Sequence, residues 1–490
     1  MPLTELLALY LSQPCAMKIL VAFLFSICSF TAFAQPSEKF SELLNQWLEQ
    51  PKLSEASVGF YALDINSGEV LADHRGSKAM IPASMMKVPT TIAALDVLGG
   101  SFRFETVLSY RGSLENGILR GDVILRGSGD PTFGSARIGK NSDELLEAFA
   151  SSIKRAGIYK VEGNLVVDNS AFPPHVPDTW AWHDLTNYYA ALPHPVNFAD
   201  NQFSILFKTG EVGTMAVLKG TNPVISGLKL DHEVMSADIR NDQTYCYGDP
   251  LGNEIRVKGA LPAKRDNFEV KAAIPDPGGF FAIKLMESIQ QSGVEWNGDV
   301  AHSEVSASAT GKELIRHQSP TLAEIVEQVN FHSVNLYAEA LGIALSEKFS
   351  DVPRNEVLKH FWTEKAGLDT RGFRPEDFSG LSHYNTVTAK QLTDMLRWVY
   401  ASDNGKVWML SLPQAGLNGT LRSFGKGTPL EANLRAKSGY MTGNRGYAGV
   451  LNVKSGRMVA FAVMVNHFEA SPSAIKSELE KLLVALYESN

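Results

Sequence analysis

The chain has 490 residues, more than one hydrophobic core usually serves, so its length predicts at least two domains. Hydrophobic residues make up 44% and charged residues 20%, an ordinary globular composition that excludes a disordered or fibrous protein. The formal net charge is −8, so the chain lacks the basic excess of a nucleic-acid-binding protein, and we expect no such partner.

The N-terminus has the pattern of a secretory signal peptide. Lys18 precedes an apolar run over residues 19–30, and Ala32 and Ala34 fit the small-residue positions before a cleavage site. The run is short for a membrane span, although an uncleaved anchor or a buried helix stays an alternative. Residues 1–16 lie outside this pattern, so we interpret them as an N-terminal over-extension of the signal peptide. We expect residues 1–34 to be cleaved and the mature chain to be periplasmic, with at most a peripheral membrane association.

The next segments change from regular elements to a long turn-rich region. Residues 55–73 predict a β-hairpin, and residues 84–98 have the apolar periodicity of a helix that begins near Ser84. Residues 101–312 combine many glycines with short alternating runs, which predicts a mostly β region. A helix–Gly–strand unit occurs twice within it, at residues 145–168 and 280–304.

Helical periodicity resumes after Pro320, and the chain ends with a hairpin over 447–466 and a docked surface helix over 472–487. Similar elements at both ends predict one domain built from residues 35–100 and 313–490. Residues 101–312 would then be an insertion, which we expect to contain two subdomains.

One serine stands out as a nucleophile. The pattern Ser-x-x-Lys occurs five times, but only the copy at Ser84 begins a long apolar helix. There Lys87 lies on the same helix face as the hydroxyl, and a neutral lysine can take the serine proton. The helix N-terminus can also stabilise a developing oxyanion. From these residues alone, a plain N-cap serine is an equal alternative.

Two later motifs add polar groups. Ser333-Val334-Asn335 lies at a boundary between helices, and Lys437-Ser438-Gly439 precedes the terminal hairpin on an expected edge strand. Gly439 would permit a close approach to that strand. Taken singly, the first motif reads as a helix cap and the second as a turn.

In this order, the three motifs resemble the Ser-x-x-Lys, Ser-Asp-Asn and Lys-Thr-Gly set of penicillin-interacting serine enzymes. The long stretch between Ser84 and Ser333 is similar to that of the low-molecular-mass class C penicillin-binding proteins, the D-alanyl-D-alanine carboxypeptidase/endopeptidases of peptidase family S13. The resemblance implies an α+β fold, with a serine β-lactamase/DD-peptidase-like domain in which helices flank an antiparallel sheet. The mostly β insertion would lie between the first and second motifs.

The resemblance also implies a mechanism. Ser84 would attack the D-Ala-D-Ala carbonyl of peptidoglycan stem peptides, with Lys87 as general base, and β-lactams would acylate the same serine. Ser333 would relay the proton, Asn335 would orient Lys87 and the substrate, and Lys437 would supply positive charge. We expect no cofactor and no metal, since the 11 histidines show no ligand spacing.

Four further residues are implied in substrate binding. Ser438 and Gly439 would lie against the terminal carboxylate of the substrate, and the backbone N–H groups of Ser84 and Tyr440 would form the oxyanion hole. Asp184, with Trp180, Trp182 and Tyr189 nearby, would contact the free amine of a diaminopimelate side chain. The alternative for Asp184 is an ordinary surface turn with core aromatics.

Two other functions stay open at this point. A β-lactamase or esterase would share Ser84, Lys87 and Lys437 but would deacylate penicillin rapidly. A catalytically silent peptidoglycan-binding scaffold is the other alternative, although a binder has no need of the full set of nucleophile, base and relay.

Overall fold

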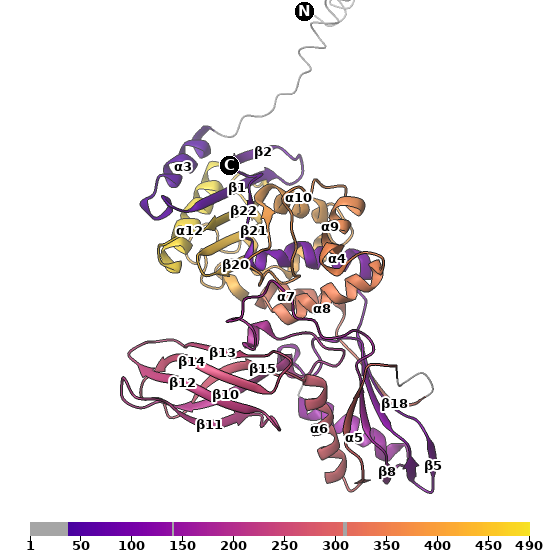
Figure 1. The fold of residues 1–490 in the computed structure, drawn as a ribbon. Coiled ribbons are helices and arrows are strands. Elements are labelled where there is room, and N and C mark those ends of the chain that lie inside the picture. Colours follow the sequence, from indigo (N-terminus) through magenta and orange to yellow (C-terminus); the bar gives the residue numbers. More distant parts are fainter. Residues whose placement is uncertain (1–37, 140–141, 307–310) are drawn as a thin grey trace, which may run out of the picture.

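The structure is a computed structural model that describes residues 38–139, 142–306 and 311–490 (Figure 1). The expected signal peptide, residues 1–34, lies outside the described residues. Within the described ranges, no helix combines the length and the apolar character needed to cross a membrane.

The two ends of the chain share one five-stranded antiparallel sheet, in the order β2-β1-β22-β21-β20. Figure 1 shows its indigo and yellow strands side by side in the upper part of the molecule. The expected hairpins near residues 55–73 and 447–466 are both confirmed within this sheet. Its strands are β1 (Ser57–Asp64), β2 (Val70–His74), β20 (Leu434–Met441), β21 (Asn444–Asn452) and β22 (Met458–Asn466).

Helices cover both faces of this sheet, which explains why β22 is apolar at nearly every position. Phe461 and Val463 face one core, which includes apolar residues of α3 (Glu38–Leu48) and α12 (Pro472–Ser489). The intervening Ala462 and Met464 belong to the core on the opposite face. The helices of that second layer are α4 (Lys87–Leu98), α7 (Leu322–His332), α8 (Asn335–Ser346), α9 (Val357–His360), α10 (Ala389–Tyr400) and α11 (Gly405–Ser411).

Helix α4 lies at the centre of the second layer, and its residues from Lys87 to Leu95 are all buried. The expected helix near Ser84 is confirmed, with the difference that its first turn, Ala83–Met86, is a 3₁₀-helix. Strand β3 (Ala79–Met80) lies just ahead of that turn in the chain and pairs with β19 (Val387–Thr388) in a short two-stranded sheet. Ser84 therefore lies at the N-terminal entry to a largely buried helix of this layer.

The inserted region carries four sheets in two groups, confirming its mostly β character. The first group has sheets β17-β9-β7-β4-β18 and β16-β8-β6-β5, with α5 (Ser142–Arg155) and α6 (Pro277–Gln291). Its strands are β4 (Glu105–Tyr110), β5 (Ser113–Glu115), β6 (Ile118–Arg120), β7 (Val123–Gly127), β8 (Lys160–Glu162), β9 (Leu165–Asp168), β16 (Glu295–Trp296), β17 (Val300–Ser303) and β18 (Lys312–Gln318). The second group has sheets β11-β10-β15 and β12-β14-β13. Its strands are β10 (Gln202–Lys208), β11 (Val217–Asn222), β12 (Lys229–Ala237), β13 (Gln243–Gly248), β14 (Glu254–Pro262) and β15 (Phe268–Ala273).

The two helix–Gly–strand units seen in the sequence are neighbours in the first group. Each helix leads into two short strands, and those of the second unit pair in parallel with those of the first, β16 with β8 and β17 with β9. Parallel strands need a crossover connection, and α5 and α6 supply the helical part of these connections. The internal similarity of the sequence thus corresponds to a paired substructure.

We propose that the two groups of sheets are the two subdomains of the insertion. Their buried apolar residues form one continuous cluster, which includes Phe149 of the first group and Val257 of the second. The returning strand β18 pairs with β4, so it belongs to a sheet of the insertion. We therefore propose a C-terminal boundary of the insertion near Gln318, a few residues beyond the expected residue 312.

Candidate active site

Three elements bring the motif residues together. Ser84 lies in the 3₁₀ turn before α4, and Lys437 lies on β20, the edge strand of the sheet. Ser333 lies between α7 and α8, and Asn335 is the first residue of α8. Gly439 lets β20 pack closely on the turn, because a Cβ at this position would lie 2.4 Å from the Pro82 carbonyl oxygen. The expected close approach is therefore present, and it brings the third motif beside the first.

The backbone is strained at two of these positions. Ser333 has φ of 61° and Ala83, directly before Ser84, has φ of 46°. Residues with a side chain rarely occupy this left-handed region, and such strain concentrates at functional sites. At Ser333 the left-handed conformation also ends α7 and directs the chain into α8.

Lys87 is the centre of the site. Its Nζ lies 3.0 Å from Ser84 Oγ, 2.6 Å from Asn335 Oδ1 and 2.6 Å from the Ser379 carbonyl oxygen. The side chain is fully buried, and burial lowers its pKa to about 7, although the carboxyl groups of Asp377 and Glu339 oppose that shift. Around neutral pH, a large fraction of this amine is therefore unprotonated.

The hydrogen bonds decide where the lone pair of the neutral amine points. The Ser379 carbonyl oxygen can only accept, and so can Asn335 Oδ1. The amide of Asn335 is held in this orientation because its Nδ2 donates to the Tyr189 carbonyl oxygen at 2.8 Å. A neutral Lys87 uses its two N–H groups on these oxygens, which leaves its lone pair for the hydroxyl proton of Ser84. This is the geometry of a general base.

A second lysine–serine pair faces the first across the site. Lys437 Nζ donates to Ser333 Oγ at 2.9 Å and to the Ser438 carbonyl oxygen at 2.9 Å. Burial, and then the charge of Lys87, lower the pKa of Lys437 well below its ordinary value. Ser438 Oγ donates to Thr420 Oγ1 at 3.0 Å on the open side of β20, so two hydroxyl groups lie together there. Tyr440 extends beyond them and is half exposed.

Asp184 lies close to the site but not in it. Its carboxylate is buried and accepts a hydrogen bond from Tyr189 Oη at 2.9 Å, and the Tyr189 carbonyl oxygen in turn holds Asn335. Of the expected aromatic neighbours, Trp182 is 62% exposed, and Trp180 directs its indole N–H to Asp377. Tyr189 is thus the aromatic residue that bonds to Asp184.

The structure adds residues that the motifs did not indicate: Ser379, Asp377, Glu339 and Thr420. Asp377 is buried and accepts hydrogen bonds from the backbone N–H groups of Gly380 and Ser382. The neighbouring Phe378 is accommodated because a Cβ on Gly342 would lie 2.0 Å from its ring, so only glycine fits in α8 at that position. Two of these four residues, Ser379 and Glu339, lie in the stretches FSGLSHYN and NFHSVNLYAEAL.

The residues from 38 onward that the structure describes contain no group of three or more His, Cys, Asp or Glu side chains placed to hold a metal ion.

The chain is similar over most of its length to known D-Ala-D-Ala carboxypeptidases. It is 29% identical over 451 residues to the D-alanyl-D-alanine carboxypeptidase DacB of Haemophilus influenzae, covering 90% of this chain and 91% of that protein. It is also 29% identical over 458 residues to the D-alanyl-D-alanine carboxypeptidase of an Actinomadura species, covering 88% and 82%. The crystal structure of penicillin binding protein 4 (dacB) from Haemophilus influenzae superposes with a TM-score of 0.78 at 26% identity, covering 91% of this chain and 99% of that one.

The last comparison confirms the expected fold, an α+β domain of the penicillin-binding type with a large insertion. The family description of the D-Ala-D-Ala carboxypeptidase 3 (S13) enzymes matches residues 40–486, nearly the whole described chain. The resemblance seen in the three motifs is therefore confirmed, and the chain belongs to the D-Ala-D-Ala carboxypeptidase 3 (S13) family.

Proposed function

We propose that this chain is a serine D-alanyl-D-alanine carboxypeptidase/endopeptidase, which cleaves peptidoglycan stem peptides through an acyl-enzyme on Ser84. The observation that carries the proposal is the hydrogen bonding of Lys87, which leaves its lone pair facing Ser84 Oγ. Membership of the family and the named carboxypeptidase relatives support the substrate class. One solved relative, penicillin binding protein 4 of Haemophilus influenzae, was crystallised with a β-lactam, which supports acylation by these antibiotics.

Acylation begins when Lys87 takes the hydroxyl proton and Ser84 Oγ bonds to the carbonyl carbon of the D-Ala-D-Ala peptide. The carbonyl oxygen becomes an oxyanion, which the backbone N–H groups of Ser84 and Tyr440 stabilise by about 3 kcal/mol each. Ser84 is partly exposed beside the buried Lys87, so substrate reaches the nucleophile while the base stays dry.

The leaving amine then receives a proton and the C–N bond breaks, which releases D-alanine. Ser333 hands on this proton, because its hydroxyl bonds to Lys437 and lies at the junction of α7 and α8 with Asn335. A water molecule next attacks the ester on Ser84, which frees the shortened peptide and regenerates the hydroxyl. For a β-lactam the broken bond is the ring amide, so the leaving group stays attached.

Substrate recognition uses the open edge of β20. The terminal carboxylate of the substrate favours the charged form of Lys437 against its burial, so this lysine supplies positive charge there. Ser438 hydrogen-bonds the same carboxylate, and Gly439 leaves the edge strand close to Ser84. Asp184 binds the free amine of the diaminopimelate side chain, and the hydrogen bond from Tyr189 Oη holds its carboxylate in place. A periplasmic location, reached through cleavage of residues 1–34, would place the enzyme beside its cell-wall substrate.

The test is the intact mass of residues 35–490 after incubation with penicillin. We expect a single adduct that is lost slowly, absent from Ser84→Ala, together with release of D-alanine from a stem pentapeptide. Ser151→Ala is a matched control, because Ser151 and Lys154 repeat the same spacing on α5 away from this site. Rapid turnover to penicilloate would indicate a β-lactamase instead. No adduct on folded wild-type protein would refute the acyl-enzyme, as a silent scaffold predicts.

A further inference from the structure

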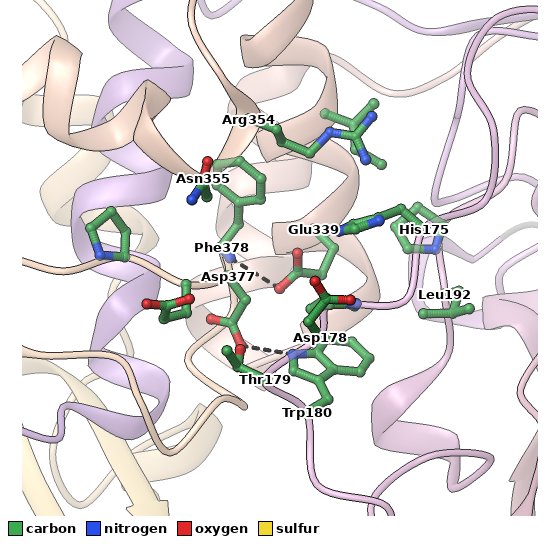
Figure 2. A pocket seen from close by; sticks show the side chains of 15 residues that line it. His175, Asp178, Thr179, Trp180, Leu192, Glu339, Arg354, Asn355, Asp377 and Phe378 are labelled. Atoms are coloured by element: carbon green, nitrogen blue, oxygen red, sulfur yellow. Dashed lines mark hydrogen bonds between the residues drawn. The ribbon is translucent and has the colours of Figure 1, made fainter.

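A buried carboxyl group lies behind the catalytic lysine and has no part in the mechanism above. Glu339, on α8 one helical turn after Asn335, is only 6% exposed. Its Oε1 accepts hydrogen bonds from the backbone N–H groups of Phe378 at 3.1 Å and Ser379 at 2.8 Å. Figure 2 shows the hydrogen bond from the backbone N–H of Phe378 to Glu339.

These bonds act on the same short segment that holds Lys87. The Ser379 carbonyl oxygen accepts from Lys87 Nζ at 2.6 Å, and the Phe378 carbonyl oxygen accepts from Thr90 on α4 at 2.8 Å. Asp377 fixes the following peptide, since its Oδ1 accepts from Gly380 N at 2.7 Å. Residues 377–380 therefore bridge α8 and α4, and Glu339 is the contact from α8.

Glu339 also borders a cavity of about 330 Å³ that lies between the insertion and the catalytic domain. Figure 2 shows Trp180 and Leu192 of the insertion on one side and Arg354 on another. Such a cavity leaves room for the segment to shift if its support on α8 is weakened. The contact of Glu339 with the two N–H groups thus supports the segment on its cavity side.

We propose that Glu339 is a positioning residue for the acylation step: by holding the amide groups of Phe378 and Ser379, it keeps the Ser379 carbonyl on Lys87 and the lone pair of that amine on Ser84. The inference rests on the proposed function, because it takes Lys87 as the base. A displacement of about 1 Å at such a support can cost a large factor in rate without touching the substrate.

Charged groups on every side define the electrostatics of Glu339. Lys87 faces it from α4, Asp377 from the bridging segment and Arg354 from the chain before α9. Burial first, and then the charge of Asp377, raise the pKa of Glu339 to about 8, so the carboxyl group is mostly protonated near pH 7. A glutamine has the shape of a protonated glutamate and keeps its accepting oxygen, which makes Glu339→Gln the conservative variant.

The test compares two conservative variants that separate the reach of the side chain from its titration. Glu339→Gln keeps the reach of the accepting oxygen and cannot titrate, whereas Glu339→Asp keeps a titratable carboxyl group and shortens the reach by one methylene. The rate constant of acylation by penicillin is measured separately from the affinity of the non-covalent complex, between about pH 5 and 9. Asp178→Asn is the matched control, since Asp178 lines the same cavity and has an exposed carboxylate.

We expect the acylation rate constant of Glu339→Gln and of Asp178→Asn to stay within about threefold of wild type, and that of Glu339→Asp to fall about 10- to 100-fold. In the Asp variant the ammonium form of Lys87 loses an acceptor, so its pKa falls and the acid limb of the profile moves to lower pH. The affinity of the non-covalent complex should change little.

A wild-type rate constant in Glu339→Asp, or a loss of more than about tenfold in Glu339→Gln, would overturn the proposal. A fall in melting temperature with an unmoved acid limb would assign Glu339 a merely structural role and overturn it too. If the Asp variant does not fold, the Gln variant decides alone by the same limits. Failure of wild type to form an adduct would instead refute the proposed function, so the two failures are distinguishable.

Discussion

The charge state of Lys87 gives the sharpest prediction. Burial lowers its pKa from 10.5 to about 7, so about half of the molecules carry the free amine at pH 7. With the ordinary pKa of 10.5, only about one molecule in 3,000 would do so at that pH. The acylation rate constant should therefore be half-maximal near pH 7 and fall about tenfold for each pH unit below it.

The perturbation is Asn335→Asp, which places a negative charge where Oδ1 now lies 2.6 Å from Lys87 Nζ. An opposite charge this close raises the pKa of a lysine by about 1–3 units, so the free amine at pH 7 falls about 5- to 500-fold. The loss is one of protonation, and raising the pH should reverse much of it. We therefore expect Asn335→Asp to acylate slowly at about pH 7 and to gain rate with rising pH until the raised pKa of Lys87, between about 8 and 10, is passed.

The assay is stopped-flow acylation by penicillin across the pH range, with the melting temperature as a check on folding. Asn66→Asp makes the same chemical change in an exposed turn between β1 and β2 and should leave the profile unmoved. A rate lost equally at low and high pH would refute the electrostatic reasoning and point to the broken contact with Tyr189. An unchanged acid limb would refute the assignment of Lys87 as the base.

Three further predictions concern the other residues of the site. Ser333→Ala should slow acylation about 100-fold without changing the melting temperature, because the proton relay to the leaving amine is removed; stopped-flow and thermal unfolding measure the two. Gly439→Ala should destabilise the fold by about 1–3 kcal/mol and block acylation, since its Cβ would lie 2.4 Å from the Pro82 carbonyl oxygen; denaturant unfolding measures the loss. Asp184→Asn should raise KM for stem peptides with a free diaminopimelate amine and leave KM for their N-acetylated forms unchanged; equal effects on both would refute its role.

The insertion contributes directly to the geometry of the site. The Tyr189 carbonyl oxygen sets the orientation of the Asn335 amide, and Trp180 donates to Asp377, which supports the segment that holds Lys87. Both contacts come from a stretch of the insertion between β9 (Leu165–Asp168) and β10 (Gln202–Lys208). The orientation of the general base therefore depends on packing between the insertion and the catalytic domain as well as on α4 and α8.

Local sequence patterns were enough to predict the elements that carry the motifs. The period of apolar residues indicated α4 and the return to helical structure after Pro320, and the two hairpins of the catalytic sheet followed from alternation around turn residues. The spacing of Ser84 and Lys87 predicted that the two side chains would meet, because residues three apart lie on one helix face. The order of the three motifs indicated the family, since each motif needs its own local element.

Contacts between distant segments depended on the tertiary structure, because no periodicity encodes them. Ser379 contacts Lys87 and Tyr189 contacts its partner Asn335 from separate parts of the chain, while Glu339 on α8 accepts from the backbone N–H of Ser379. Strand β18 is assigned to the insertion only because it pairs with β4, and no local pattern predicts that pairing. The lowered pKa of Lys87 likewise arises from burial among helices, against the opposing charge of carboxyl groups hundreds of residues away, and local sequence specifies neither effect.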